Sequence, residues 1–234
     1  MKRCHRRLLI TAALPLFVLL TMNPDLVAQE QSVNPGINEA FVDPDVDEFK
    51  AKFEIESREV YAKREDIVKS LSIQPGMAVA DIGAGTGLFT RLFSVETGES
   101  GKVFAIDISD TFTDHISKLA ADEGLKNIQA IQCEPDSTRL PPSSIDIAFV
   151  CDAYHHFEFP SKTLKSIYRA LRPDGKLVLI DFKRVDGVSS DWTMNHVRAG
   201  QEVFESEIIV AGFKKSADID DLLEENYMVF FTKE

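Results

Sequence analysis

Cysteine is scarce in this sequence, whose 234 residues include three cysteines and one tryptophan. Cys4 lies in a basic N-terminal stretch, so Cys133 and Cys151 are the only cysteines in the rest of the chain. So few cysteines exclude a small scaffold held together by disulfides. The chain is 44% hydrophobic and 27% charged, which is typical of one α/β domain that buries a core of ordinary size.

Basic residues are also fewer than acidic ones. The chain has 26 lysines and arginines against 38 aspartates and glutamates, a formal net charge of −12. Residues 1–28 contain four basic residues and one acidic residue, so the chain from residue 29 onward carries −15. An acidic domain repels phosphate backbones and anionic lipids. We therefore expect no nucleic acid partner.

One long uncharged run is present, the thirteen residues LLITAALPLFVLL at 8–20. It follows the basic stretch MKRCHRR, and a small residue, Ala28, comes shortly after it. This layout predicts a signal peptide at 1–28. A membrane span needs roughly 20 apolar residues, so an uncleaved short anchor is the alternative, and it would be the chain's only contact with a membrane. Arg6-Arg7 before Leu8 also resembles a twin-arginine export signal. The protein is expected to be exported (periplasmic or secreted) or tethered.

Strands and helices alternate after this segment. Residues 29–42 read as a linker and 43–234 as one domain, which opens with a helix over 43–71 that has a break near 55–57. Further helices are predicted at 88–95, 111–123, 161–175 and 191–211. Strands are predicted at 77–83, 102–108, 128–133, 145–151, 176–182 and 225–233. This alternation favours a parallel sheet with helices on both faces, and ligands of such sheets bind at the carboxyl ends of the strands.

The stretch DIGAGTG at 81–87 joins the first strand to the next helix. Its glycines, Gly83, Gly85 and Gly87, let the backbone approach a ligand closely. The dinucleotide fingerprint G-x-G-x-x-G would need a glycine where Leu88 stands. A nicotinamide-dependent oxidoreductase is therefore only an alternative.

Four stretches in order, VADIGAGTGLFTRLF, VFAIDIS, PDSTRLPPSSIDIAFV and LRPDGKLVLIDF, resemble the class I S-adenosylmethionine-dependent methyltransferases, specifically the small type 11 group, over about residues 45–234. The resemblance implies a Rossmann-like, doubly wound sheet of seven strands in the order 3-2-1-4-5-7-6, mostly parallel with an antiparallel C-terminal strand. It also implies S-adenosyl-L-methionine as the cofactor. In that strand order the ends of the third and fourth strands lie about 14 Å apart, so no disulfide is expected between Cys133 and Cys151.

The resemblance also assigns cofactor contacts. Asp81 and the three glycines would lie by the methionine part, and Asp107 would hold the ribose hydroxyls. Asp136 would meet the adenine amino group with Ser137 beside it, although Glu134 is a rival. Ile108, after Asp107, and Asp152, after the fourth strand, complete this set.

Cations on the first helix are candidates for the methionine carboxylate. Arg58, Tyr61 and Arg64 are spaced i, i+3 and i+6, so one helix face could present them. The alternative is a helix whose arginines pair with the neighbouring glutamates.

The chemistry is expected just after the fourth strand, in CDAYHHFEF at 151–159. Amino-group methyltransferases often carry an Asn- or Asp-Pro-Pro-Tyr loop there, so nucleobase or glutamine methylation is disfavoured. Tyr154, His155 and His156 are the catalytic candidates, with His155 favoured as a base. Alternatively, one histidine is packed and the other caps a helix. No metal-ligand set is predicted.

A later segment, DWTMNHVRAG at 191–200, contains Trp192, His196 and Arg198 and is either acceptor pocket or core. The sequence thus predicts in-line methyl transfer to a small-molecule acceptor. The alternatives are the oxidoreductase and a binding domain of the same fold without turnover.

Overall fold

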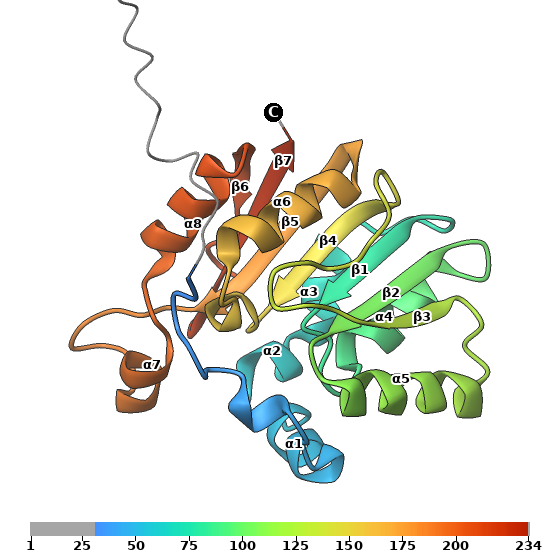
Figure 1. Cartoon of the computed structure of the whole chain (residues 1–234), viewed down its shortest axis with the longest axis horizontal. Coiled ribbons are helices and arrows are strands. Elements are labelled where there is room, and N and C mark those ends of the chain that lie inside the picture. The colour runs from blue at the N-terminus through green and yellow to red at the C-terminus, as the bar shows by residue number, and fades with distance from the viewer. Residues whose placement is uncertain (1–30, 234) are drawn as a thin grey trace, which may run out of the picture.

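A seven-stranded sheet forms the centre of the protein (Figure 1). The computed structural model describes residues 31–233, and the predicted signal peptide lies outside them. The sheet order is β3-β2-β1-β4-β5-β7-β6, as the resemblance implies. The strands are β1 (Ala78–Ile82), β2 (Lys102–Asp107), β3 (Ile128–Gln132), β4 (Ile145–Cys151), β5 (Leu171–Phe182), β6 (Phe213–Asp218) and β7 (Asn226–Lys233).

The first five strands pair in parallel, and β7 runs antiparallel between β5 and β6. The strand β6 was not predicted. Its residues FKKSAD are mostly polar and largely exposed, so it lacks the apolar pattern that marks a strand in the sequence. An edge strand with charged side chains resists pairing with other chains.

Helices cover both faces of the sheet. Three of them, α3 (Arg64–Ser70), α4 (Leu88–Thr97) and α5 (Asp110–Glu123), pack on one face, where Phe93 and Ile116 are fully buried. The opposite face is covered by α6 (Pro160–Ala170) and α8 (Gln201–Val210), through buried side chains such as Leu164 and Phe204. The sandwich fixes the strand ends, because both faces of β1 and β4 are packed.

Short helices lie beyond the carboxyl ends of the strands (Figure 1). They are η2 (Glu39–Phe41), α1 (Val46–Phe53), α2 (Glu59–Ala62), η3 (Tyr154–His156) and α7 (Asp191–His196). The single helix predicted over 43–71 is three helices, α1, α2 and α3, and the predicted break near 55–57 separates the first two. Likewise, the helix predicted over 191–211 is two, because Val197–Gly200 interrupts it.

Residues 31–42 pack on the domain, which corrects their prediction as a linker. The Val33 N–H donates to the Glu158 carbonyl at 2.9 Å, and the Asn38 side chain donates to the His156 carbonyl at 3.1 Å. The Phe41 ring lies 5.1 Å from the His156 ring. This segment is therefore part of the wall of the pocket described below.

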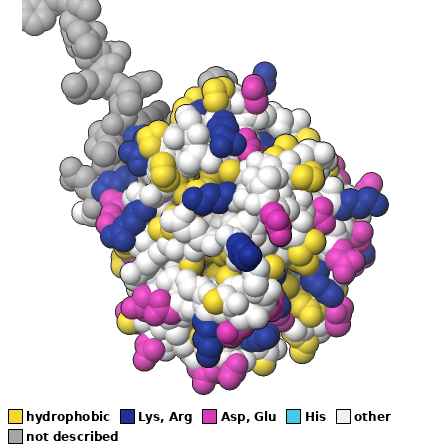
Figure 2. Space-filling model, turned by 90° about the vertical axis from the view of Figure 1, so that its right-hand side faces the viewer, with side chains coloured by type: hydrophobic (Ala, Val, Ile, Leu, Met, Phe, Trp, Pro, Cys, Tyr) yellow, Lys and Arg dark blue, Asp and Glu magenta, His cyan; other side chains and the backbone are white. Residues whose placement is uncertain are grey.

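The surface drawn in Figure 2 mixes acidic and basic side chains rather than gathering one sign in an extended area. Within residues 31–233, no helix combines the length and apolar composition that a membrane span requires. Cys133 and Cys151 are both free thiols.

Candidate functional site

A pocket of about 650 Å³ opens at the carboxyl ends of β1, β2 and β4. Much of its lining comes from the segment 37–41, α1, the glycine loop, the end of β2, the loops after β3 and β4, and α7. Its walls are mainly apolar, and its buried carboxyl groups come from residues at or just after the strand ends. This is where parallel α/β sheets bind ligands.

The glycine loop forms the floor of the pocket. Gly83 has a φ of 78°, and a Cβ there would overlap the side chain of Ala153, so no other residue fits. Gly85 also lines the pocket. Gly87 does not: it precedes α4, and a Cβ on it would press on Ile116. Its predicted cofactor contact is thus corrected to a role in packing the helix.

Asp107 and Ile108 line the pocket at the end of β2. The Asp107 carboxylate is buried and accepts the N–H groups of Gly85 at 2.8 Å and Ser109 at 2.9 Å. Burial raises its pKa to about 6, and these backbone donors limit the rise. A carboxylate with free acceptor capacity in a pocket suits a ligand that brings two hydroxyl donors.

Asp81, the residue before the last of β1, lies in the same wall. Its carboxylate accepts the Thr90 hydroxyl at 2.6 Å. Burial raises its pKa to about 7, and the nearby Asp107 adds to the rise. Two buried carboxyl groups in one pocket favour a positively charged ligand, which would stabilise their ionised forms. The pocket therefore fits a sulfonium cofactor better than a dinucleotide with its pyrophosphate.

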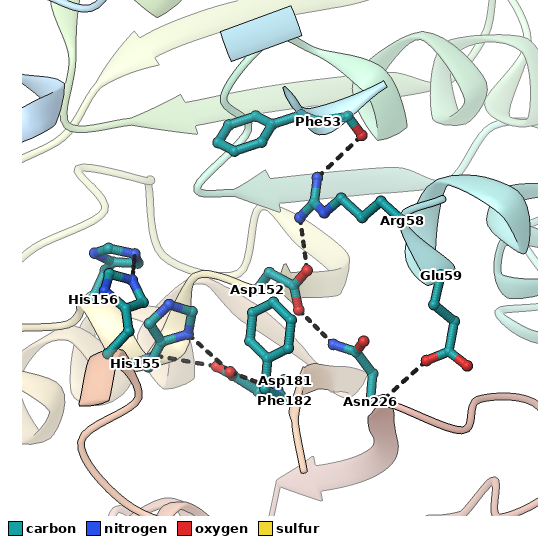
Figure 3. A network of polar contacts seen from close by, with 10 residues as sticks. Phe53, Arg58, Glu59, Asp152, His155, His156, Asp181, Phe182 and Asn226 are labelled. Carbon is teal, nitrogen blue, oxygen red and sulfur yellow. Dashed lines mark hydrogen bonds and ion pairs between the residues drawn. The ribbon is translucent and has the colours of Figure 1, made fainter. Parts of the chain in front are cut away.

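A polar network holds α2 against the strand ends (Figure 3). The Arg58 guanidinium donates to Asp152 at 2.6 Å, and the Asn226 amide donates to the other oxygen of Asp152 at 2.6 Å. Glu59 in turn accepts the Asn226 N–H at 2.9 Å. Burial raises the pKa of Asp152, whereas Arg58 opposes the rise. Arg58 and Asp152 line the pocket as predicted candidates, but they are paired with each other.

Tyr61 does not share the pocket with Arg58. Arg58 is the extended N-cap of α2 rather than a helical residue, and the chain turns at Lys63 between α2 and α3, so Tyr61 and Arg64 line a separate small hollow. There the Arg64 guanidinium lies 4.1 Å from the centre of the Tyr61 ring. The predicted i, i+3, i+6 face is therefore wrong, because it assumed one continuous helix.

Asp136 lies outside the pocket, while its neighbours Ser137 and Glu134 line it. The Asp136 carboxylate pairs with Lys162 on α6 at 3.2 Å, and both side chains are partly exposed. The rival Glu134 thus has the better position, although it also pairs with Arg139 at 2.6 Å. The tight turn at 134–137 decides which acid faces inward.

Tyr154 is buried in the core, 1% exposed, and does not line the pocket. Its hydroxyl donates to Glu207 on α8 at 2.9 Å. Burial raises its pKa well above the ordinary value, and the Glu207 carboxylate adds to the rise. This overturns its prediction as a catalytic residue, because its one polar atom is directed at a neighbouring helix. Arg198 pairs with the same glutamate at 2.6 Å.

His155, on η3, lines the pocket and is held by a carboxylate (Figure 3). Its ring Nδ1 lies 2.8 Å from Asp181 Oδ1, and its backbone N–H donates to Asp181 Oδ2 at 3.1 Å. Burial lowers the pKa of His155, but the carboxylates of Asp181 and Asp152 together outweigh it, and the pKa lies above the ordinary value. The sequence prediction did not include Asp181, although an acid inside the apolar run KLVLIDF was a signal.

His156 and His196 complete a histidine cluster at this end of the pocket. Their Nε2 atoms are 3.3 Å apart. Burial lowers the pKa of His156 to about 3, with both neighbouring histidines contributing. Burial, and then His155, also lower the pKa of His196. The cluster brings together η3 and the end of α7, which are 40 residues apart.

Aromatic rings surround the histidine cluster and the space between it and the glycine loop. Trp192 is 54% exposed and stacks on the His196 ring at 4.6 Å. The other aromatic side chains of the lining are Phe41, Phe49, Phe53, Phe89, Phe112, Phe157 and Phe182. Most of them come from α1, η2 and loops, whose contribution to the pocket the sequence did not predict.

Comparison with known proteins agrees with this geometry. The model of a family described as "Methyltransferase domain" matches residues 80–179, from within β1 to within β5. The ubiquinone/menaquinone biosynthesis C-methyltransferase UbiE of Shewanella sediminis is 28% identical over 118 residues, which cover 50% of this chain and 47% of that protein. UbiE of Bordetella avium is 32% identical over 114 residues, 49% of this chain and 44% of its own. The chain thus matches about half the length of these relatives.

Solved structures share the fold. A SAM-dependent methyltransferase from Aquifex aeolicus superimposes with a TM-score of 0.71 at 23% identity, covering 81% of this chain and 98% of that one.

The sheet order, the glycine turn and the acid ending β2 are the features that the resemblance to the class I S-adenosylmethionine-dependent methyltransferases implies. Residues 80–179 of this chain match the methyltransferase domain that the family model describes, and the chain shares its fold with the solved methyltransferase. The cofactor of the class is S-adenosyl-L-methionine. The comparisons give no support to the nicotinamide-dependent alternative.

Proposed function

We propose that this protein transfers the methyl group of S-adenosyl-L-methionine to a small, largely apolar acceptor that carries an ionisable atom. The observation that supports this most is one pocket that joins Asp107 and the glycine loop to the histidine cluster and Trp192. A cofactor at the first end and an acceptor at the second would share a single space. Holding two reactants in line supplies most of the acceleration of such a displacement.

The residues at the cofactor end of the pocket suit S-adenosyl-L-methionine. The cofactor supplies a methyl group on a positively charged sulfur. Asp107 would accept the ribose hydroxyls, and Ser137 or Glu134 would lie by the adenine. Gly83 and Gly85 keep the floor free of side chains, and the buried carboxyl of Asp81 offsets the positive charge.

The acceptor end favours a flat ring. Its aromatic walls offer stacking surface, and Trp192 and Phe182 lie beside the histidines. The UbiE relatives are named as C-methyltransferases of ubiquinone and menaquinone biosynthesis. Both observations support a hydroxylated aromatic compound as the acceptor class.

His155 is the base of this proposal. A hydroxylated acceptor gains nucleophilicity when it loses its proton, and a positioned histidine can accept it. Because Nδ1 faces Asp181, Nε2 is the atom left for the acceptor. The Nε2 of His156 faces His196 instead, which makes His156 the weaker candidate.

Two measurements test the proposal. Titration calorimetry should detect binding of S-adenosyl-L-methionine, whereas NAD should bind at least about a hundredfold more weakly. Release of S-adenosylhomocysteine over a panel of phenols and hydroquinones should then identify turnover. Binding without release from any acceptor would favour the non-catalytic domain, and tighter binding of NAD would overturn the cofactor.

We also propose that the protein is exported, or tethered by its N-terminal segment. The basic stretch, the apolar run at 8–20 and Ala28 support this. Because the twin-arginine route moves folded proteins, it would let the domain fold and bind its cofactor before export. Replacing Arg6 and Arg7 by lysine should abolish the exported form on fractionation. Unchanged export would reject this route, and a full-length membrane fraction would favour a tether.

A further inference from the structure

Three histidines from two separate segments converge at the acceptor end of the pocket. His155 and His156 come from η3, and His196 ends α7. One ring nitrogen of each lies within 4.8 Å of the other two. Neither family resemblance nor sequence spacing pointed to this group, because forty residues separate its members.

The spacing of the nitrogens matches that of metal ligands. Zinc–nitrogen bonds of about 2.0–2.1 Å at tetrahedral angles separate the ligand nitrogens by about 3.3 Å. The Nε2 atoms of His156 and His196 are 3.3 Å apart. Since the remaining pairs lie within 4.8 Å, ring rotations that shorten them by up to about 1.5 Å complete a tetrahedral arrangement.

The surroundings of the cluster are those of a metal site. The Nδ1 of His155 is held by the buried Asp181 carboxylate at 2.8 Å, so Nε2 remains for a ligand bond. A carboxylate behind a ligating histidine fixes its tautomer and raises its basicity. The backbone of His156 is tied to Asn38 at 3.1 Å, and Trp192 stacks on His196. Each ring therefore has a neighbour that restricts it.

We propose that His155, His156 and His196 bind one divalent transition-metal ion of the zinc class. Three imidazole nitrogens suit zinc, cobalt, nickel or copper, whereas magnesium and calcium prefer oxygen ligands. Three protein ligands leave the fourth position of a tetrahedral ion open. All three histidines line the pocket, so a molecule bound there would be able to reach that position.

The ion would act on the acceptor. An oxygen or sulfur atom of the acceptor at the open position would lose its proton more readily, because the cation stabilises the resulting anion. In the metal-bound protein this replaces His155 as the means of activation. The site itself does not depend on the methyl-transfer proposal, because the ion can be bound with neither cofactor nor acceptor present.

Metal binding by the full chain tests the inference directly. The protein should carry no polyhistidine tag and be dialysed against chelator before calorimetry with Zn²⁺ and visible spectroscopy with Co²⁺. We expect one Zn²⁺ per chain with a dissociation constant of micromolar or below, and the intense visible bands of tetrahedral Co²⁺. Mg²⁺ should give no comparable binding.

Variants locate the site. His196→Ala and His196→Gln should each weaken Zn²⁺ binding at least about tenfold and remove the cobalt bands. Asp181→Asn, behind His155, should weaken it by about 10–100-fold. The matched control is His115→Ala, since His115 lies on α5 outside the cluster, and it should bind as the wild type does.

The affinity for S-adenosyl-L-methionine shows whether each variant is folded. The inference is overturned if the wild type binds no Zn²⁺, if Mg²⁺ competes equally, or if a His196 variant that keeps its cofactor affinity binds Zn²⁺ unchanged. A failure of this kind leaves the release of S-adenosylhomocysteine by metal-free protein unaffected, so the two proposals fail separately.

Discussion

The carboxylate of Asp107 accepts the N–H of Gly85 at 2.8 Å and thereby ties the end of β2 to the glycine loop after β1. The contact links two strand ends that the sequence had marked separately. It also holds the carboxylate in the wall of the pocket. We therefore expect the loop and the acid to act together in the proposed binding of the cofactor.

Asp107→Ala should weaken binding of S-adenosyl-L-methionine by about 1.5–3 kcal/mol, the scale of lost hydrogen bonds to a charged group. Calorimetry measures the change. Asp136→Ala is the matched control, because Asp136 pairs with Lys162 outside the pocket, and its affinity should not change. If both variants lose the same affinity for the cofactor, Asp136 contacts the adenine after all.

Cofactor affinity should depend on pH with a definite sign. Because burial raises the pKa of Asp107 to about 6 and of Asp81 to about 7, both carboxyls gain protons as the pH falls through this range. A cationic ligand with hydroxyl donors prefers the ionised forms, so its affinity should fall.

Asp107 alone predicts a loss of about fourfold between about pH 7.5 and 5.5, and Asp81 increases the loss. Calorimetry at the two pH values measures it. In Asp107→Asn, the part of this pH-dependent loss of affinity that Asp107 causes should be absent. Affinity that rises on acidification would contradict the assignment of both carboxyls to the pocket wall.

Tyr154→Phe should lower stability while leaving turnover within about twofold. The hydroxyl is buried and donates to Glu207, and removing it leaves that carboxylate with one donor fewer, at a cost of about 1–3 kcal/mol. Denaturant unfolding gives the stability, and the S-adenosylhomocysteine assay gives the turnover. A variant of normal stability without turnover would restore Tyr154 to the catalytic set.

Trp192→Ala should raise the KM for the acceptor and leave the cofactor affinity as it is. The ring stands at the exposed rim of the histidine end, stacked on His196, and far less cofactor surface is expected there. Steady-state kinetics with one accepted phenol measures KM, and Val210→Ala is a control for an exposed side chain outside the pocket. An unchanged KM would place the acceptor elsewhere.

The sequence predicts the sheet well because strand ends, glycine turns and apolar alternation are local signals. The strand order followed from the family resemblance, and the positions of Gly83, Asp107 and His155 at the strand ends followed from these local signals. These residues sit on packed strands, or one turn beyond them, where the register leaves little freedom.

The errors lie where the tertiary structure decides. Tyr61 was placed by treating Arg58, an extended N-cap, as a residue of the helix. Asp136 was placed by counting along a turn whose direction the spacing does not determine. Tyr154 was placed beside His155 although consecutive residues of a helical turn face different ways. Asp181, Asn226 and His196 reach the site from distant segments, so only the folded chain brings them together.

The most direct test of the account is the rate of S-adenosylhomocysteine release by the wild type and by His155→Ala, with cofactor affinity measured on the same samples. The account predicts acceptor-dependent release by the wild type. It predicts a rate about 10²–10⁴-fold lower for His155→Ala at unchanged cofactor affinity, since that histidine takes the acceptor's proton in metal-free protein. Equal rates in the two proteins would contradict it.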